Sequence, residues 1–209
     1  MKKRILAGLM TIVMLFTVLP LNVFAGGDDS VVWASTYDEL VAALANPKVS
    51  YLYIAAQHPA KDENGNIIME NGASVMEPFT WPEGECTLNL ESNTLPYVSV
   101  YGDWVIPENV TVNHNLTVTY PDDRSSITCN GTWNRLSKSA RISTSNDFTL
   151  NGLMTVPTGT YSLLADMNGG LFYLNGELRL PDNAVVIVDK LILGDGALIS
   201  GSYLSAIEY

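Results

Sequence analysis

Basic residues are scarce in this chain. Its 209 residues include 11 Lys and Arg against 22 Asp and Glu, which gives a formal net charge of −11 at pH 7. A surface with this balance repels phosphate backbones and anionic lipid headgroups. We therefore expect no nucleic-acid partner, and we interpret the acidity as a source of solubility rather than as loose Ca²⁺ capture.

Histidine and cysteine are scarcer still, with two residues of each. His58 and His114 are too few for a histidine-rich zinc site, and we interpret both as surface residues. Cys86 and Cys129 lie 43 residues apart; either they form one disulfide across stacked turns or they are two buried thiols. The sequence also lacks a phosphate-binding glycine loop and a nucleophile elbow, so we predict no metal ion and no cofactor.

The only long apolar run lies at the start of the chain. Residues 1–4 are basic at Lys2, Lys3 and Arg4, residues 5–19 are mostly apolar, and residues 23–25 suit a signal peptidase. The run is shorter than the roughly 20 residues of a membrane span, and no cysteine follows it for lipid anchoring. We predict a signal peptide at 1–25 and a secreted or cell-surface domain at 26–209, without membrane contact after cleavage. Cleavage leaves 8 basic against 22 acidic residues, a net charge of −14.

A six-residue phrase recurs in the second half of the chain: Gly, any residue, apolar, any residue, apolar, Pro. It begins at Gly102, Gly152 and Gly176, with weaker copies at Gly131 and Gly196, so the spacings are 29, 21, 24 and 20 residues. A period of this size is typical of stacked supersecondary units, and these units are rich in β-formers. We predict an all-β fold: a single-stranded, right-handed parallel β-helix, or β-solenoid.

Three Asn-Gly pairs occupy one phase of this repeat, at residues 130–131, 151–152 and 175–176. A single pair indicates a hairpin and hence a meander or sandwich. Recurrence in phase instead favours stacked corners, where Asn amides bond from turn to turn and Gly adopts left-handed backbone. In the weak Gly131 copy, Arg135 replaces an apolar residue, and we expect it to weaken that turn.

The apolar positions of the repeat predict the interior. Trp104 and Trp133 both lie two residues after a repeat glycine, which indicates core packing rather than a sugar platform. The other residues expected inside are Leu150, Met154, Leu174, Leu178 and Leu198. Trp81 lies outside the repeat and is therefore the better candidate for an exposed contact.

The N-terminal part of the domain does not follow the repeat. Thr36 and Glu39 form a capping-box pattern, and the helix it begins leads into a strand at 49–56, so we predict a capping helix–strand unit at 35–56. Residues 58–85 hold Asn71-Gly72 between apolar segments, which predicts an excursion shaped as a hairpin arm. Repeat turns then occupy 86–204.

The helix–strand start at 36–56 and the Asn-Gly turns at 130–176 resemble secreted bacterial right-handed β-helix proteins, the pectate-lyase-like architecture. The resemblance implies an architecture only. Lyases of this shape combine carboxylate-bound Ca²⁺ with a basic residue, and hydrolases use two or three aspartates. The best local match, Asp122-Asp123-Arg124, also fits a polar corner, and Asp103, Asp166, Asp182 and Asp195 lie mostly in turn contexts. We therefore assign no catalytic residue.

These observations favour a structural or adhesive β-solenoid protein that contacts extracellular polysaccharide or cell-surface glycan without catalysis. The alternative is a β-helix polysaccharide lyase or glycoside hydrolase, which three or more outward carboxylates in one groove would favour. Residues 196–201 are still in repeat phase, and the tail lacks the polar face of a terminal cap. We expect the chain to continue past Tyr209 or to associate end to end.

The predicted leader gives a first test. Because the peptidase-compatible residues end at Ala25, N-terminal sequencing of exported protein should begin at Gly26. Intact Met1 on protein from the extracellular fraction would contradict the prediction.

Overall fold

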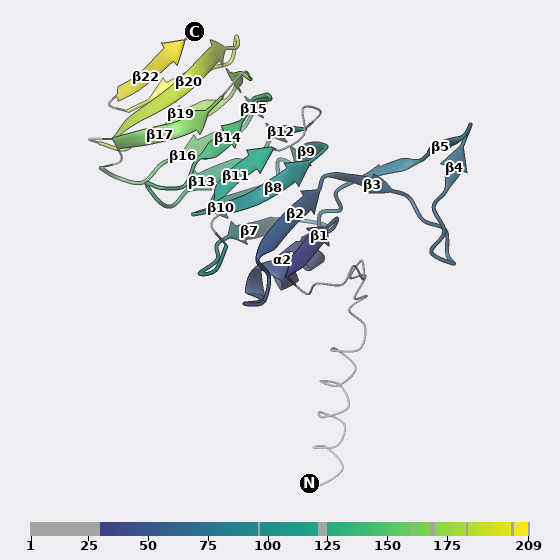
Figure 1. Cartoon of the computed structure of the whole chain (residues 1–209). Helices are drawn as coiled ribbons and strands as arrows, with labels where there is room; N and C mark the ends of the chain where they lie inside the picture. The colour runs from purple at the N-terminus through teal and green to yellow at the C-terminus, as the bar shows by residue number, and fades with distance from the viewer. Residues whose placement is uncertain are drawn as a thin grey trace, which may run out of the picture.

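The chain folds into a stack of parallel strands, a β-solenoid of about seven turns (Figure 1). The computed structural model describes residues 30–95, 97–120, 125–159, 161–167, 170–182, 184–201 and 203–208. The expected signal peptide at 1–25 and the corner at 122–124 lie outside these residues. Each turn contributes short strands to three faces, and alternate residues of a strand point into the core.

The first face is the largest, with strand order β1-β2-β8-β11-β14-β17-β20 and β22 beside β20. Its strands are β1 (Val31–Ala34), β2 (Tyr51–Ala55), β8 (Tyr97–Tyr101), β11 (Thr117–Tyr120), β14 (Ile142–Thr144), β17 (Tyr161–Asp166), β20 (Val185–Leu193) and β22 (Tyr203–Glu208). The second face holds β9 (Asp103–Ile106), β12 (Ser126–Cys129), β15 (Phe148–Leu150) and β18 (Phe172–Leu174). Strand β20 pairs with both β17 and β18 and so crosses from the first face to the second.

The third face is a separate six-stranded parallel sheet. Its strands are β7 (Cys86–Leu90), β10 (Val110–His114), β13 (Thr132–Arg135), β16 (Leu153–Thr155), β19 (Glu177–Arg179) and β21 (Leu198–Ser200). All three faces bury their inward side chains in one continuous core.

The predicted interior is confirmed where the repeat is strongest. Leu150, Met154, Leu174 and Leu178 are fully buried. Aromatic rings continue the core from turn to turn, and the rings of Phe148 and Phe172 stack 5.1 Å apart. Each such residue packs against equivalents above and below it, which is how short turns bury a complete apolar face.

Two predictions from the repeat are wrong: that Gly102 begins the same strand position as Gly131, and that Leu198 lies in the interior. Trp104 is buried as expected, but it belongs to the second face and pairs with Ile127. Trp133 lies on the third face and pairs with Met154. Leu198 pairs with Glu177 and is 54% exposed, because its neighbour Ile199 takes the position above Leu178.

The Asn-Gly corners stack as predicted, but the reason for glycine differs. The Asn151 amide donates to the Asn130 Oδ1 at 2.8 Å, and the Asn175 amide donates to the Asn151 Oδ1 at 2.8 Å. The corner glycines are not among the residues with positive φ. A Cβ on Gly152 would instead lie 1.9 Å from the carbonyl oxygen of Gly131 in the turn below. Glycine is required by close approach of successive turns, not by left-handed backbone.

Helix α2 (Tyr37–Ala45) lies beside β7 at the N-terminal end of the stack (Figure 1). The Thr36 Oγ1 accepts the Glu39 N–H at 3.3 Å, as in a capping box. The Glu39 carboxylate, however, accepts the Ser35 N–H at 2.8 Å, one residue before the N-cap. The Tyr37 hydroxyl donates to the Thr87 carbonyl, so the helix is tied to the edge of the third face.

A hairpin arm leaves the stack between β2 and β7, where a second-face strand would otherwise lie. Strand β3 (Gln57–Pro59) pairs antiparallel with β6 (Met76–Pro78), and β4 (Met69–Glu70) pairs with β5 (Ala73–Ser74). Asn71 and Gly72 form its tight turn, with φ of 51° and 83°. Figure 1 shows the arm projecting away from the stack.

The two cysteines are free thiols, so the disulfide alternative is wrong. Cys86 is partly buried on the third face, while Cys129 is fully buried on the second, where burial raises the pKa of its thiol to about 12. Strands stack only on strands of the same face, so a residue of the third face is never stacked directly on a residue of the second. Cys86 and Cys129 therefore cannot meet across stacked turns.

The corner geometry predicts a sharp difference between two glycines. Gly152→Ala forces a Cβ against backbone that cannot yield, so we expect a loss of about 2–4 kcal/mol in the free energy of unfolding. Gly159 has a φ of 65° and open space around its Cβ position, so Gly159→Ala should cost only about 1 kcal/mol. Chemical denaturation of both variants measures this, and equal losses would contradict the close-approach explanation.

Candidate functional site

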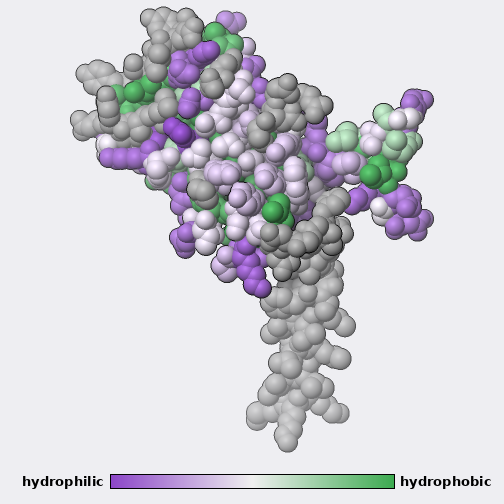
Figure 2. Space-filling model, in the orientation of Figure 1, coloured by the Kyte–Doolittle hydropathy of each residue, from purple (hydrophilic) through white to green (hydrophobic). Residues whose placement is uncertain are grey.

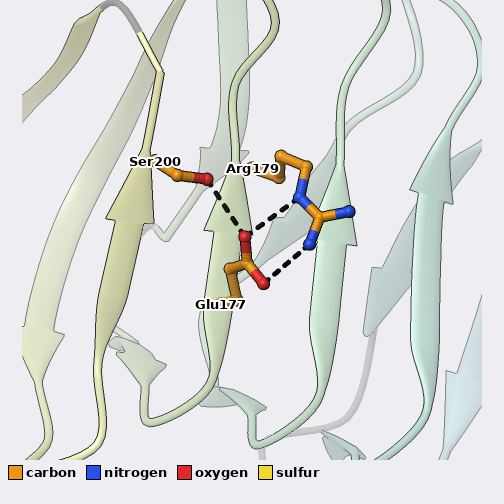
Figure 3. A network of polar contacts seen from close by, with 3 residues as sticks. All are labelled: Glu177, Arg179 and Ser200. Carbon is orange, nitrogen blue, oxygen red and sulfur yellow. Dashed lines mark hydrogen bonds and ion pairs between the residues drawn. The ribbon is translucent and has the colours of Figure 1, made fainter.

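The polar side chains of the third face bond mainly to one another. The Asn113 amide donates to Asn89 at 2.8 Å, the Asn134 amide to Asn113 at 2.9 Å, and the Thr155 hydroxyl to Asn134 at 2.7 Å. Higher on the same face, the Glu177 carboxylate accepts two bonds from the Arg179 guanidinium and one from the Ser200 hydroxyl (Figure 3). Arg179 accordingly lowers the pKa of Glu177. These ladders stabilise the stack and leave the first face as the better surface for a ligand.

On the first face, one row of outward-pointing side chains runs across the strands, with one member on each strand from β1 to β20. Strand register places each member directly beside the next, from β1 to β17. Asp189 follows Val188, the partner of Ala165, and so continues the column on β20. We call this set the first-face column; its members are Trp33, Tyr53, Ser99, Thr119, Ser143, Asp166 and Asp189.

The lower end of the column is aromatic. The Trp33 ring centroid lies 4.6 Å from that of Tyr53 and 4.7 Å from that of Tyr101, and the two tyrosine rings meet edge to face at 5.5 Å. Trp33 is 40% exposed, and Tyr51 and Tyr97 beside the cluster are also exposed. We call these five residues the aromatic patch. Mutual packing fixes the rings of Trp33, Tyr53 and Tyr101 in advance, so a ligand orders few side chains there on binding.

Short hydroxyl side chains follow the aromatic patch. The Ser99 and Thr119 hydroxyl oxygens lie 3.0 Å apart in a hydrogen bond. Ser99 is buried among its taller neighbours, while Thr119 and Ser143 are half-buried. The middle of the column therefore consists of short polar side chains, between larger side chains at its two ends.

The upper end of the column forms a polar pocket of about 310 Å³. Its lining residues are Ser143, Thr144, Ser145, Asp166 and Asp189. The Arg141 guanidinium lies 4.0 Å from the Asp166 carboxylate, and both side chains reach solvent. Hydroxyls and carboxylates can together donate to and accept from a polyhydroxylated ligand.

Trp81, the predicted candidate for an exposed contact, is half-buried and packs against the core. Its ring stacks on Trp104 at 5.6 Å, and its indole N–H donates to the Val105 carbonyl at 2.9 Å. Trp81 therefore covers the edge of β9 where the arm returns to the stack. The arm itself carries exposed apolar side chains, visible as green surface in Figure 2; they are Ile67, Ile68, Met69 and Met76.

His114 is fully buried, so its interpretation as a surface residue is wrong. Its Nδ1–H donates to the Leu116 carbonyl at 3.1 Å, and its ring meets Trp133 edge to face. Arg135, paired with it on the next turn, is also buried and donates to the carbonyls of Ser137 and Lys138. Burial lowers the pKa of Arg135 to about 10, so it stays charged at neutral pH. His58, in the arm, faces Glu77 at 3.8 Å.

The described ranges contain no cluster of three His, Cys, Asp or Glu side chains that could hold a metal ion. In the same ranges, no helix has the length and apolarity needed to cross a membrane. Asp103, expected in a turn context, lies instead in β9 and accepts the Ser126 hydroxyl at 2.8 Å.

Sequence reasoning missed both ends of the first-face column. The signal for the aromatic end was present, because Tyr51 and Tyr53 alternate with the buried Leu52 and Ile54. An aromatic residue between inward aliphatic ones must point outward. Asp166, expected in a turn context, is instead the last residue of β17.

Comparison of the chain with protein-family models, with curated proteins and with solved structures finds no match.

The buried histidine predicts a pH dependence of stability. Burial lowers the His114 pKa from 6.5 to about 4, with Arg135 adding to the effect. The unfolded chain binds the proton first, so stability is complete above pH 6.5 and is lost as the pH falls toward 4, by about 3 kcal/mol. His114→Gln should remove this part of the acid sensitivity in denaturation series, while His58→Gln should keep it. A His114→Gln profile parallel to wild type would contradict this.

Proposed function

We propose that this protein is a secreted or cell-surface β-solenoid with a structural or adhesive role that contacts glycans and performs no catalysis itself. The observation that carries the proposal is the aromatic patch on the outer side of β1, β2 and β8. Exposed clusters of large aromatic side chains on a soluble protein mark interaction sites more often than scattered apolar residues do.

The chemistry of the patch suits sugars. Tryptophan and tyrosine offer broad apolar ring faces together with an N–H or O–H group at the edge. A sugar ring has the matching combination of C–H faces and hydroxyl edges. The net charge of −11 disfavours phosphate-bearing partners, and the hydroxyl column beside the patch provides further hydrogen-bond partners for a sugar.

A second candidate function, polysaccharide hydrolysis or lysis, has one supporting observation. Asp166 and Asp189 line the same pocket, and paired carboxylates are the usual acid and base of glycoside cleavage. They are two carboxylates rather than the three that would favour catalysis. Incubation with neutral and acidic polysaccharides in the presence of Ca²⁺ tests this function; product formation abolished by Asp166→Asn would establish it over pure binding.

Trp33→Ala tests the proposed function directly. Removing the central ring of the aromatic patch should weaken retention on insoluble cellulose, xylan or chitin about tenfold, equivalent to about 1.4 kcal/mol. Tyr173→Ala is the matched control, because Tyr173 is an outward, half-buried aromatic residue of the second face. Thermal melts should show both variants folded.

Two outcomes would contradict the proposal. One is failure of the wild-type protein to bind any polysaccharide of the panel. The other is binding by Trp33→Ala that equals binding by Tyr173→Ala and by wild type.

A further inference from the structure

The geometry points to a specific ligand and direction: we infer that a linear, uncharged polysaccharide lies along the first-face column, across the strands, from the aromatic patch to the polar pocket. This inference rests on the proposed glycan contact. It adds the class of glycan and the path that the glycan follows.

The length of the column favours a polymer over a single sugar. It crosses seven strands, from Trp33 on β1 to Asp189 on β20. Neighbouring strands lie about 4.8 Å apart, so six spacings extend over about 29 Å. A monosaccharide would reach only one end, whereas a chain of several sugars contacts both ends and the hydroxyls between them.

The order of side chains along the column matches an extended saccharide. Rings at the patch offer a stacking surface at one end. Thr119 and Ser143 are low enough for the saccharide to pass and can bond to its hydroxyls. At the other end, the Asp166 and Asp189 side chains can accept hydrogen bonds from sugar hydroxyls.

The charge of the column selects against acidic polymers. Two carboxylates line the pocket, and the nearby Arg141 guanidinium lies 4.0 Å from only one of them, Asp166. A uronic acid placed beside Asp189 would meet like charge in a protein that is already strongly acidic. Neutral hexose or pentose chains avoid this repulsion and keep every hydrogen bond.

Calorimetric titration with cello- and xylo-oligosaccharides from dimer to hexamer tests the path. We expect affinity to rise at least tenfold from dimer to hexamer. Asp189→Ala should lower hexamer affinity about tenfold and leave the weak dimer affinity unchanged, because a dimer held at the aromatic patch does not reach the pocket. Asp103→Ala, an exposed carboxylate on the second face, should bind like wild type.

Substitutions that remove charge but keep an acceptor oxygen test the selectivity. The double variant Asp166→Asn, Asp189→Asn should bind the neutral hexamer within about threefold of wild type. It should also gain affinity for oligogalacturonides, which wild type should bind at least tenfold more weakly than neutral chains. Wild-type protein that binds oligogalacturonides as tightly as neutral hexamers would overturn the inference.

The outcomes distinguish the extended ligand path from the proposed glycan contact on which it rests. Binding that Trp33→Ala abolishes, but that shows no length dependence and no response to Asp189→Ala, would confine the glycan to the patch. That result overturns the extended path and leaves glycan contact standing. Absence of wild-type binding to every oligosaccharide and polysaccharide would overturn both.

Discussion

Main-chain hydrogen bonds between successive turns are the interaction on which the rest of this structure depends. At the Asn-Gly corners, the N–H groups of Asn151 and Gly152 both donate to the Cys129 carbonyl, at 2.8 and 3.1 Å, and Leu153 donates to Gly131 at 3.0 Å. These contacts bring one turn so close to the next that no Cβ fits between them. The spacing of the stack is thus set by backbone, and side chains must comply with it.

The corners of the stack also explain how an interior position can hold a cation. Arg135 occupies a core position of β13, yet its guanidinium reaches the carbonyls of the corner that follows, at Ser137 and Lys138. A buried charge is tolerated when nearby carbonyls accept from it, and this corner accepts from the Nε and Nη2 groups of Arg135. The sequence pattern did not indicate these carbonyls, and the expected weakening of this turn stays a prediction. The arm also leaves the stack at such a connection, between β2 and β7, so it interrupts no strand of the stack.

The architecture was predictable from the sequence because a repeat of 20–24 residues reports directly on stacking, and the interior Leu and Met residues follow its phase. Face assignment was not predictable. A glycine followed by alternating apolar residues occurs before β9 on the second face as well as before β13 on the third, so Trp104 and Trp133 look equivalent in sequence. Only the hydrogen-bond partner separates them. The first-face column could not be predicted for a related reason. Tyr53 and Ser99 are neighbours in space, but the whole arm lies between them in the chain.

The same backbone constraint shapes what the surface can do. Outward side chains of the first face hold their positions because the strands beneath them are paired in register, not because the side chains pack into a core. Trp33 and Asp189 can therefore change without moving the strands that carry them, whereas an inward residue such as Leu178 cannot. Stability and binding are consequently separable in this fold. Substitutions along the column therefore test the proposed ligand path without the loss of structure that a core substitution causes.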